Sequence, residues 1–572
     1  MPQPTLLDAG PAPGGPPPTA RRSDLVLPGV TLLTFVIVAV LVLVPLGFLL
    51  VKTFTVDGSF SLAAFADTVN YPGFGAALWT TVVFAVLATV IALVTGSTTA
   101  FVLVRTDVPA RRALSLVVLV PLILPSVLYA MAWVFLASPR IGLLEHFLGW
   151  TALDVYSVGG MALVQGLAMA PLAHLAFAGT FTSMDPSLEE AARVGGASAV
   201  RTFRRVTLPL ARPALLSTTV LCFTLAVEGF EIPILLGLPN KQFTLTTLIY
   251  QAIGEYPPDY GVAGAISTML VVALALVILA QNRAMRATRS FQTISAKGHS
   301  ARRLSLGAWR WPVCALTWAY VGVIVVAPVV MLAYASTQTF YRPPSWESLA
   351  TASLDSYRAA AGTRDFADAA INSVLLSVVV ASALMFLMSV VAWIRVRSGL
   401  RLAWVVESIA TVPLVVPGLI LGVALLTVYV NADIGVYGGL GILVIAYMTR
   451  YMPFGVRYAQ NAMYQIDDHL EESARVSGAS RWRAFVRVLV PLMRPGLVAG
   501  WIFIAIVSFR DLSTPVLLYS SDSKVFPVLV LEKWQNGALS EAATMGMMLV
   551  LFLLVVGALA AVPLRRSGGV RL

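Results

Sequence analysis

One polar segment occurs twice in this chain, and the second copy begins 282 residues after the first. Residues 189–215 read EEAARVGGASAVRTFRRVTLPLARPAL, and residues 471–497 read EESARVSGASRWRAFVRVLVPLMRPGL. The copies align without a gap, and 17 of the 27 aligned residues are identical. A repeat of this length indicates two copies of one structural unit, so the fold must accommodate the same unit twice.

Each copy carries the signals of two short helices joined by a tight turn. An N-cap residue begins the first helix, and a glycine suited to positive φ ends it after about two turns. A serine then caps a second, arginine-bearing helix, and a proline is predicted to end that helix. In that order the residues are Asp185, Gly196, Ser198 and Pro209 in the first copy and Asp467, Gly478, Ser480 and Pro491 in the second.

The composition of the whole chain is that of an integral membrane protein. Hydrophobic residues make up 58% of the 572, and charged residues only 12%, whereas soluble domains carry about 25% charged residues. Apolar runs long enough to cross a bilayer predict an all-α membrane protein of about 12 spans, arranged as two parallel six-helix repeats. The runs lie near 25–51, 75–104, 113–137, 158–181, 213–237 and 262–282, and near 311–335, 370–394, 402–430, 437–460, 495–519 and 542–564.

The basic residues predict how the chain is oriented and divided. The net charge of +11 does not indicate nucleic-acid binding, because most arginines lie at span ends on one side, as cytoplasmic anchors do. Both termini are therefore expected in the cytoplasm. The predicted divisions are a disordered tail at 1–23, a first six-helix domain at 24–290, a cytoplasmic linker at 291–308 and a second six-helix domain at 309–572.

No sequence motif for catalysis or cofactor binding is found. The chain lacks a G-x-x-x-x-G-K-[ST] phosphate loop, so ATP hydrolysis is not expected of it. Cys222 and Cys314 both lie in apolar runs, and the four histidines lack metal-ligand spacing. We therefore expect no catalytic residues, cofactor or bound metal.

Charged residues inside predicted spans are costly and suggest function. Glu228 and Glu231 lie in the fifth span of the first half, and Arg510 and Asp511 lie in the fifth span of the second. Glu228 aligns with Arg510 at the repeat offset, so the two could face one another and line a translocation pathway. A structural ion pair, or a position near the wet outer surface, is the alternative. His174 is interpreted as a hydrogen-bonded packing residue.

The repeated segment resembles the "EAA" cytoplasmic loop in the transmembrane subunits of bacterial ABC importers. That resemblance implies the type I importer fold, with each loop forming a coupling helix that docks on one of two ATPase subunits. Small residues there permit close approach, and the glycine sets the turn. The residues carried over are Glu189, Glu190, Ala191, Ala192 and Gly196, and Glu471, Glu472, Ser473, Ala474 and Gly478.

The presence of both halves in one chain resembles the fused permeases of ferric-iron uptake. The stretch FEIPILLGLPNKQFTLTTLIYQAI (Phe230–Ile253) is most similar to that group. The resemblance implies an inner-membrane permease that receives solute from an extracytoplasmic binding protein and works by alternating access. Thiamine, phosphonate and polyamine import remain alternatives. An ion-coupled secondary transporter, which can also contain parallel repeats, is the alternative from another class; it leaves the duplicated cytoplasmic helices unexplained.

Overall fold

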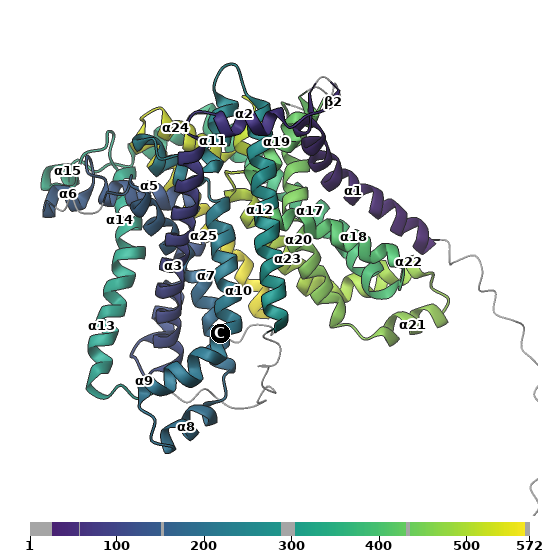
Figure 1. Cartoon of the computed structure of the whole chain (residues 1–572), viewed down its shortest axis with the longest axis horizontal. Helices are drawn as coiled ribbons and strands as arrows, with labels where there is room; N and C mark the ends of the chain where they lie inside the picture. The colour runs from purple at the N-terminus through teal and green to yellow at the C-terminus, as the bar shows by residue number, and fades with distance from the viewer. Residues whose placement is uncertain are drawn as a thin grey trace, which may run out of the picture.

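The computed structural model describes residues 26–56, 58–149, 154–287, 304–430, 435–436 and 438–566, and these are almost entirely helical (Figure 1). The predicted tail at 1–23 and most of the predicted linker lie outside the described residues. The first half contains α1 (Val26–Thr53), β1 (Thr55–Val56), β2 (Ser59–Phe60), α2 (Ala63–Asn70), α3 (Phe74–Arg105), α4 (Arg111–Val117), α5 (Ser126–Ala137), α6 (Leu143–Leu148), α7 (Val158–Ser183), α8 (Pro186–Val194), α9 (Ala199–Thr202), α10 (Leu208–Glu228), α11 (Leu245–Gly254) and α12 (Tyr260–Ala287).

The second half repeats this order of long and short helices. It contains α13 (Arg310–Val321), α14 (Ala327–Ser336), α15 (Trp346–Ala350), α16 (Asp355–Ala361), α17 (Arg364–Arg397), α18 (Arg401–Thr411), α19 (Gly418–Tyr429), α20 (Leu440–Tyr464), α21 (Asp468–Val476), α22 (Arg481–Ala484), α23 (Val490–Arg510), α24 (Phe526–Gln535) and α25 (Leu539–Arg566).

Within the described ranges, nine helices are long and apolar enough to cross a membrane, and eleven if each of two bent pairs counts as one span. The predicted span near 437–460 is α20, which is not among them. Its 25 residues include Arg450 and Arg457, and many of its side chains are buried by neighbouring helices. The all-α, two-repeat architecture is confirmed.

Two predicted spans are broken rather than continuous. The run near 113–137 bends by 103° between α4 and α5, and the run near 402–430 bends by 110° between α18 and α19. Pro125 and Pro417 precede the second helix of each pair in extended conformation. A proline removes an N–H donor and disfavours helix at the residue before it, so the chain breaks there.

The prediction that Pro209 and Pro491 end their helices was wrong. Five-residue π-turns, η2 (Phe203–Thr207) and η9 (Phe485–Leu489), directly precede α10 and α23. Each short arginine-bearing helix therefore continues through the proline into the membrane, giving helices of 29 and 30 residues. A π-turn shifts the hydrogen-bond register, and such turns occur as single insertions inside α-helices.

The fifth spans are also shorter than predicted. The run expected near 213–237 ends as helix at Glu228, and the run near 495–519 ends at Arg510. The residues that follow, Gly229 and Asp511, are extended, and short turns begin at Pro233 and Pro515. The charged residues singled out in the sequence therefore lie where these helices stop.

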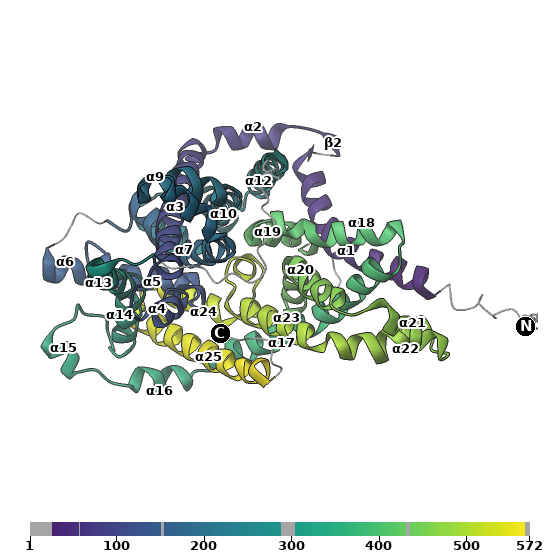
Figure 2. The ribbon, with the colours of Figure 1, turned by 90° about the horizontal axis from the view of Figure 1, so that it is seen from below.

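The first span of each half packs against the other half (Figure 2). α1 lies against α18 and α19, while α13 and α14 lie against α4 and α5. Hydrogen bonds also join each of these spans to the other half. Thr449 Oγ1 donates to the Leu41 carbonyl at 3.0 Å, and Tyr129 OH donates to the Ile324 carbonyl at 2.9 Å. The two halves are thereby interlocked.

Close packing of small residues joins α3 to α7. A Cβ added at Gly96 would lie 2.5 Å from Ala173 Cβ and 2.7 Å from the Ala170 carbonyl oxygen, so only glycine fits there. Thr99 Oγ1 and His174 Nδ1 lie 3.1 Å apart in the same contact. Small interface residues let membrane helices approach closely, and the packing interpretation of His174 is confirmed.

Candidate functional site

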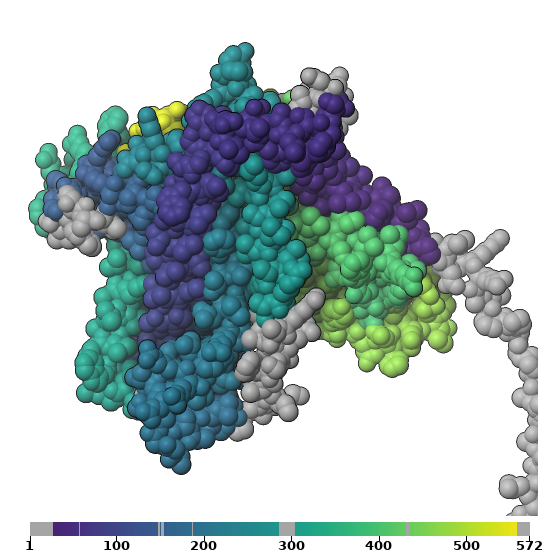
Figure 3. Space-filling model, in the orientation of Figure 1, coloured from purple at the N-terminus to yellow at the C-terminus, as the bar shows by residue number. Residues whose placement is uncertain are grey.

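Two short helices, α8 and α21, lie beside α9 and α22 on the lower side of the molecule in Figure 1, and Figure 3 shows α8 projecting from the body. The predicted helix ends are confirmed in both copies. The Asp185 carboxylate accepts from the Ser187 N–H at 2.9 Å, and that of Asp467 accepts from the His469 N–H at 3.0 Å. Gly196 and Gly478 end the helices at φ +82° and +87°, the left-handed region that suits a C-terminal glycine.

The first glutamate of the first copy faces inward. Glu189 pairs with Arg105, the last residue of α3, and accepts a hydrogen bond from Thr207 Oγ1 at 2.7 Å. The Arg105 side chain is 1% exposed and that of Glu189 is 13% exposed. One carboxylate thus ties α8 to the end of a membrane-spanning helix and to the π-turn below α10.

The second copy has an equivalent anchor with different partners. Arg397, the last residue of α17, lies with its Nε 3.7 Å from a Glu471 carboxylate oxygen and also pairs with Asp468. Its guanidinium donates to the Ile466 carbonyl at 2.7 Å. In the sequence, Arg105 and Arg397 count only among the arginines at span ends that predict orientation. Their place at the end of the second long span of each half was the signal that could have identified these anchors.

The opposite face of each short helix is exposed and partly apolar. The side chains of Glu190 and Glu472 point outward, and His469 lies 3.3 Å from the Glu472 carboxylate. Val194 and Val476 are each 90% exposed. Residues three apart share a helix face, so the exposed stripes are Leu188, Ala191 and Val194 on α8 and Leu470, Ser473 and Val476 on α21; Ala192 and Ala474 are half-buried.

The charged residues at the ends of α10 and α23 lie close to a third element, α20, which was not predicted to contribute to the site. Arg450, in the middle of α20, lies with its Nε 3.8 Å from the Asp511 carboxylate and interacts electrostatically with Glu228 and Glu231. Among the described residues, no ion pair joins Glu228 to Arg510. Because an arginine inside an apolar run suggests function by default, Arg450 could have been predicted from the sequence.

These five charged residues, Glu228, Glu231, Arg450, Arg510 and Asp511, are called the polar centre. Both of its arginines donate hydrogen bonds to carbonyls at the bent spans. Arg450 Nη1 donates to the Val416 carbonyl at 3.3 Å, and Arg510 donates to the Leu122 carbonyl in the other half. Non-helical backbone at membrane depth needs such partners. A Cβ added at Gly418 would lie 2.8 Å from Arg450 Cζ, so the glycine leaves room for the guanidinium. The polar centre therefore links the broken spans of the two halves.

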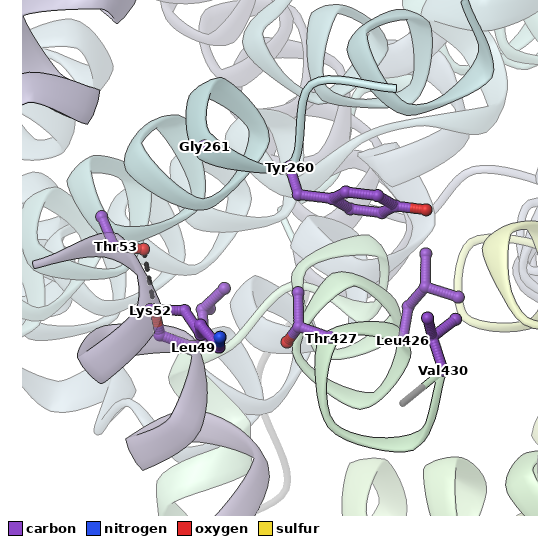
Figure 4. A pocket seen from close by; sticks show the side chains of 8 residues that line it. All are labelled: Leu49, Lys52, Thr53, Tyr260, Gly261, Leu426, Thr427 and Val430. Atoms are coloured by element: carbon purple, nitrogen blue, oxygen red, sulfur yellow. Dashed lines mark hydrogen bonds between the residues drawn. The ribbon is translucent and has the colours of Figure 1, made fainter. Parts of the chain in front are cut away.

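A cavity of about 220 Å³ lies where α1, α12 and α19 meet (Figure 4). It is at the ends of α1 and α19 remote from the short helices α8 and α21 (Figure 1). It is lined by Leu49, Lys52, Thr53, Tyr260, Gly261, Leu426, Thr427 and Val430. Lys52 and Tyr260 are its only ionisable side chains, and Thr53 Oγ1 donates to the Leu49 carbonyl at 2.8 Å. Across the described part of the chain, no group of three or more His, Cys, Asp or Glu side chains is placed to hold a metal ion.

Comparison with known proteins gives a family match. Residues 92–288 and 385–565, together more than half of the chain, match the family described as binding-protein-dependent transport system inner membrane component. The putative ferric transport system permease protein FbpB 1 of Haemophilus influenzae is 25% identical over 443 residues, which cover 75% of this chain and 68% of that protein. The Fe(3+)-transport system permease protein FbpB 2 of the same organism is 25% identical over 485 residues, covering 82% and 87%.

A solved structure also aligns with one half of the chain. It is a bacterial ABC transporter involved in the import of the acidic polysaccharide alginate. The alignment covers 46% of this chain and 96% of that one, at 22% identity and a TM-score of 0.40.

Proposed function

Because the chain belongs to the family of binding-protein-dependent transport system inner membrane components, we propose that it forms the whole translocation pathway of an ATP-driven ferric-iron importer. The chain is a multi-pass membrane component of that family, with the family's domain present twice. Relatives named as ferric transport permeases, similar over most of this chain, support iron as the solute.

The observation that carries the proposal is the pair of anchored short helices. α8 and α21 each present an exposed apolar stripe on one side of the molecule and are each fixed by an inward glutamate to an arginine at a span end. An isolated short helix is only marginally stable. The glutamate–arginine pairs fix these two helices with one face exposed, where a partner can bind. Two ATPase subunits, one on each helix, would supply the hydrolysis for which this sequence has no phosphate loop.

The rest of the mechanism follows from placing the two short helices in the cytoplasm, with both termini on that side. A loaded binding protein would dock on the opposite face, where α2, α11 and α24 lie (Figure 1). Closure of the ATPases would move α8 and α21, and their arginine anchors would carry that motion into α3 and α17. The long helices would then tilt as rigid bodies and expose the polar centre alternately to each side.

The polar centre is proposed to line the pathway. Glu228, Glu231 and Asp511 supply negative charge, and Arg450 and Arg510 tie them to the bent spans. Ionisable residues within membrane spans commonly mark ion pathways. The two arginines also favour one alternative solute, a phosphonate, because a guanidinium pairs well with phosphate-like oxyanions. Uptake of labelled ferric iron, set against uptake of a labelled phosphonate, distinguishes the two.

The test of the partnership uses the exposed valines, which leave the anchors intact. The double variant Val194→Asp, Val476→Asp should abolish co-purification of ATPase subunits, which the wild-type chain should retain at two copies. Val69→Asp is a matched control, since Val69 is 63% exposed on α2 at the opposite face. Equal capture of ATPase by all three proteins would refute the assignment of α8 and α21 as coupling helices.

A further inference from the structure

We propose that residues 304–309, where the segment joining the two halves re-enters the fold, form a strap that positions the first coupling helix through Arg105. Asp107 and Leu304 are its positioning residues. The proposal rests on the proposed function only in giving α8 the coupling role. The segment that joins the two halves would then help to transmit motion between α8 and the spans, as well as connect the halves.

The strap is held by backbone hydrogen bonds on both sides of one residue. The Leu304 N–H donates to the Arg105 carbonyl at 2.7 Å, and the Asp107 N–H donates to the Leu304 carbonyl at 3.3 Å. These two bonds form a parallel bridge between Leu304 and Thr106. A short piece of the second half is thereby paired, strand-like, with the loop that follows α3.

The carboxylate of Asp107 closes the strap. One oxygen accepts from the Leu306 N–H at 2.9 Å, and the other lies 3.4 Å from Ser305 Oγ. The Cys314 thiol lies 3.6 Å from the Pro109 carbonyl oxygen, so the beginning of α13 touches the same loop. Hydrogen bonds to an ionised group are the stronger kind, which makes Asp107 the main side-chain contact of the strap.

Arg105 connects the strap to the coupling helix. Its carbonyl is one of the last in α3, which have no partner within the helix, and Leu304 supplies that partner. Its side chain holds Glu189 on α8. The backbone and the side chain of Arg105 thus join the strap to α8. A shift of the strap therefore changes the position of the Arg105 guanidinium.

In the second half, the turn that follows α17, the counterpart of α3, is stabilised differently. After Arg397 the chain turns at Gly399, whose φ is +65°, and the Leu400 N–H donates to Ser398 Oγ at 3.1 Å. That turn is made by neighbouring residues rather than by a segment 199 positions away. Because α21 is anchored at Arg397 without the strap, it serves as an internal control within the same molecule.

The experiment measures amide hydrogen exchange of the detergent-purified chain, by mass spectrometry, in Asp107→Ala and in Leu304→Pro. Peptides from α8 should exchange at least about fivefold faster than in wild type, whereas peptides from α21 should be unchanged. Ser305→Ala, which removes only the longer contact, should leave α8 close to wild type. Cutting the chain at a protease site placed between residues 295 and 296 should also leave α8 protected, because the strap contacts lie beyond the cut.

Equal exchange of α8 in wild type and in both strap variants would overturn the proposal. So would equal acceleration in α8 and α21, since that would mean general destabilisation. Neither result depends on an ATPase being bound. A chain in which α8 responds as expected but no ATPase co-purifies would support the strap and remove the proposed function. With ATPase present, Asp107→Ala should keep two subunits bound and lower the solute transported per ATP hydrolysed.

Discussion

The two adjacent glutamates in each of the short helices α8 and α21 should differ in their response to replacement by alanine. Glu189 points inward, where its carboxylate pairs with Arg105 and accepts from Thr207. Glu190, the next residue of the same helix, is exposed. We predict that Glu189→Ala weakens the packing of α8 against the membrane domain. Glu190→Ala should leave that packing intact and affect only the binding of a partner to α8.

The magnitude follows from the burial of the pair. Arg105 is 1% exposed, so removing its partner leaves a buried charge uncompensated, which costs about 3–5 kcal/mol. At about 1.4 kcal/mol per tenfold change, the opening equilibrium of α8 should rise by roughly two to four powers of ten. An exposed substitution such as Glu190→Ala typically changes stability by less than about 0.5 kcal/mol, or roughly twofold.

Amide exchange of the peptide covering 186–194 measures this opening directly. Glu189→Gln keeps the shape of the side chain but removes its charge, so it should fall between wild type and Glu189→Ala. Exchange in Glu189→Ala within about twofold of Glu190→Ala would refute the reasoning, because it would mean that the carboxylate does not hold the helix. The pair Glu471→Ala and Glu472→Ala repeats the comparison on α21.

Three further predictions concern packing, the polar centre and the strap. Gly96→Val should lower the unfolding temperature in detergent, since overpacking costs about 1–3 kcal/mol. Gly179→Val should not, because a Cβ there meets nothing within 4 Å. Equal unfolding temperatures for the two variants would contradict the close contact between α3 and α7. Arg450→Met should reduce transport and lower stability by about 3 kcal/mol, because the buried Asp511 carboxylate loses its partner. Arg457→Met, at an exposed position two turns further along the same helix, should do neither, and similar transport by both variants would contradict the proposed pathway role of Arg450. The Leu306 N–H bond holds the pKa of Asp107 below its ordinary 3.8, so the strap's stabilisation should persist at neutral pH and be lost only as pH falls through that lower value; carbon-13 NMR of labelled aspartates measures it, and a pKa above 3.8 would contradict the bond.

Local chemistry made the ends of the short helices predictable. The N-cap aspartates, the glycines at positive φ and the repeat spacing depend on a few neighbouring residues, and Asp185, Gly196, Asp467 and Gly478 all behave as their sequence predicts. The membrane class and the two-repeat fold were also predictable, because hydropathy reports burial in lipid without knowledge of tertiary contacts.

Features that depend on partners distant in sequence were not predictable in the same way. The pairing of Glu189 with Arg105 crosses 84 positions, and the bond from Arg510 to the Leu122 carbonyl crosses 388. The bends at Pro125 and Pro417 had a visible cause, yet an apolar run gives no sign of whether a proline kinks a span or breaks it. That outcome depends on whether another element can satisfy the freed carbonyls.

The exchange of first spans has a consequence for how the protein is made. α1 leaves the ribosome early, but its hosts α18 and α19 lie about 350 residues further along the chain. At about 5–20 residues per second, synthesis of that interval takes roughly 20–70 s. During this time lipid must solvate the face of α1 that α18 and α19 later cover, which its apolar composition permits. A chain that carries both halves keeps the waiting helix and its host on one polypeptide, so their meeting does not depend on finding a second subunit in the membrane.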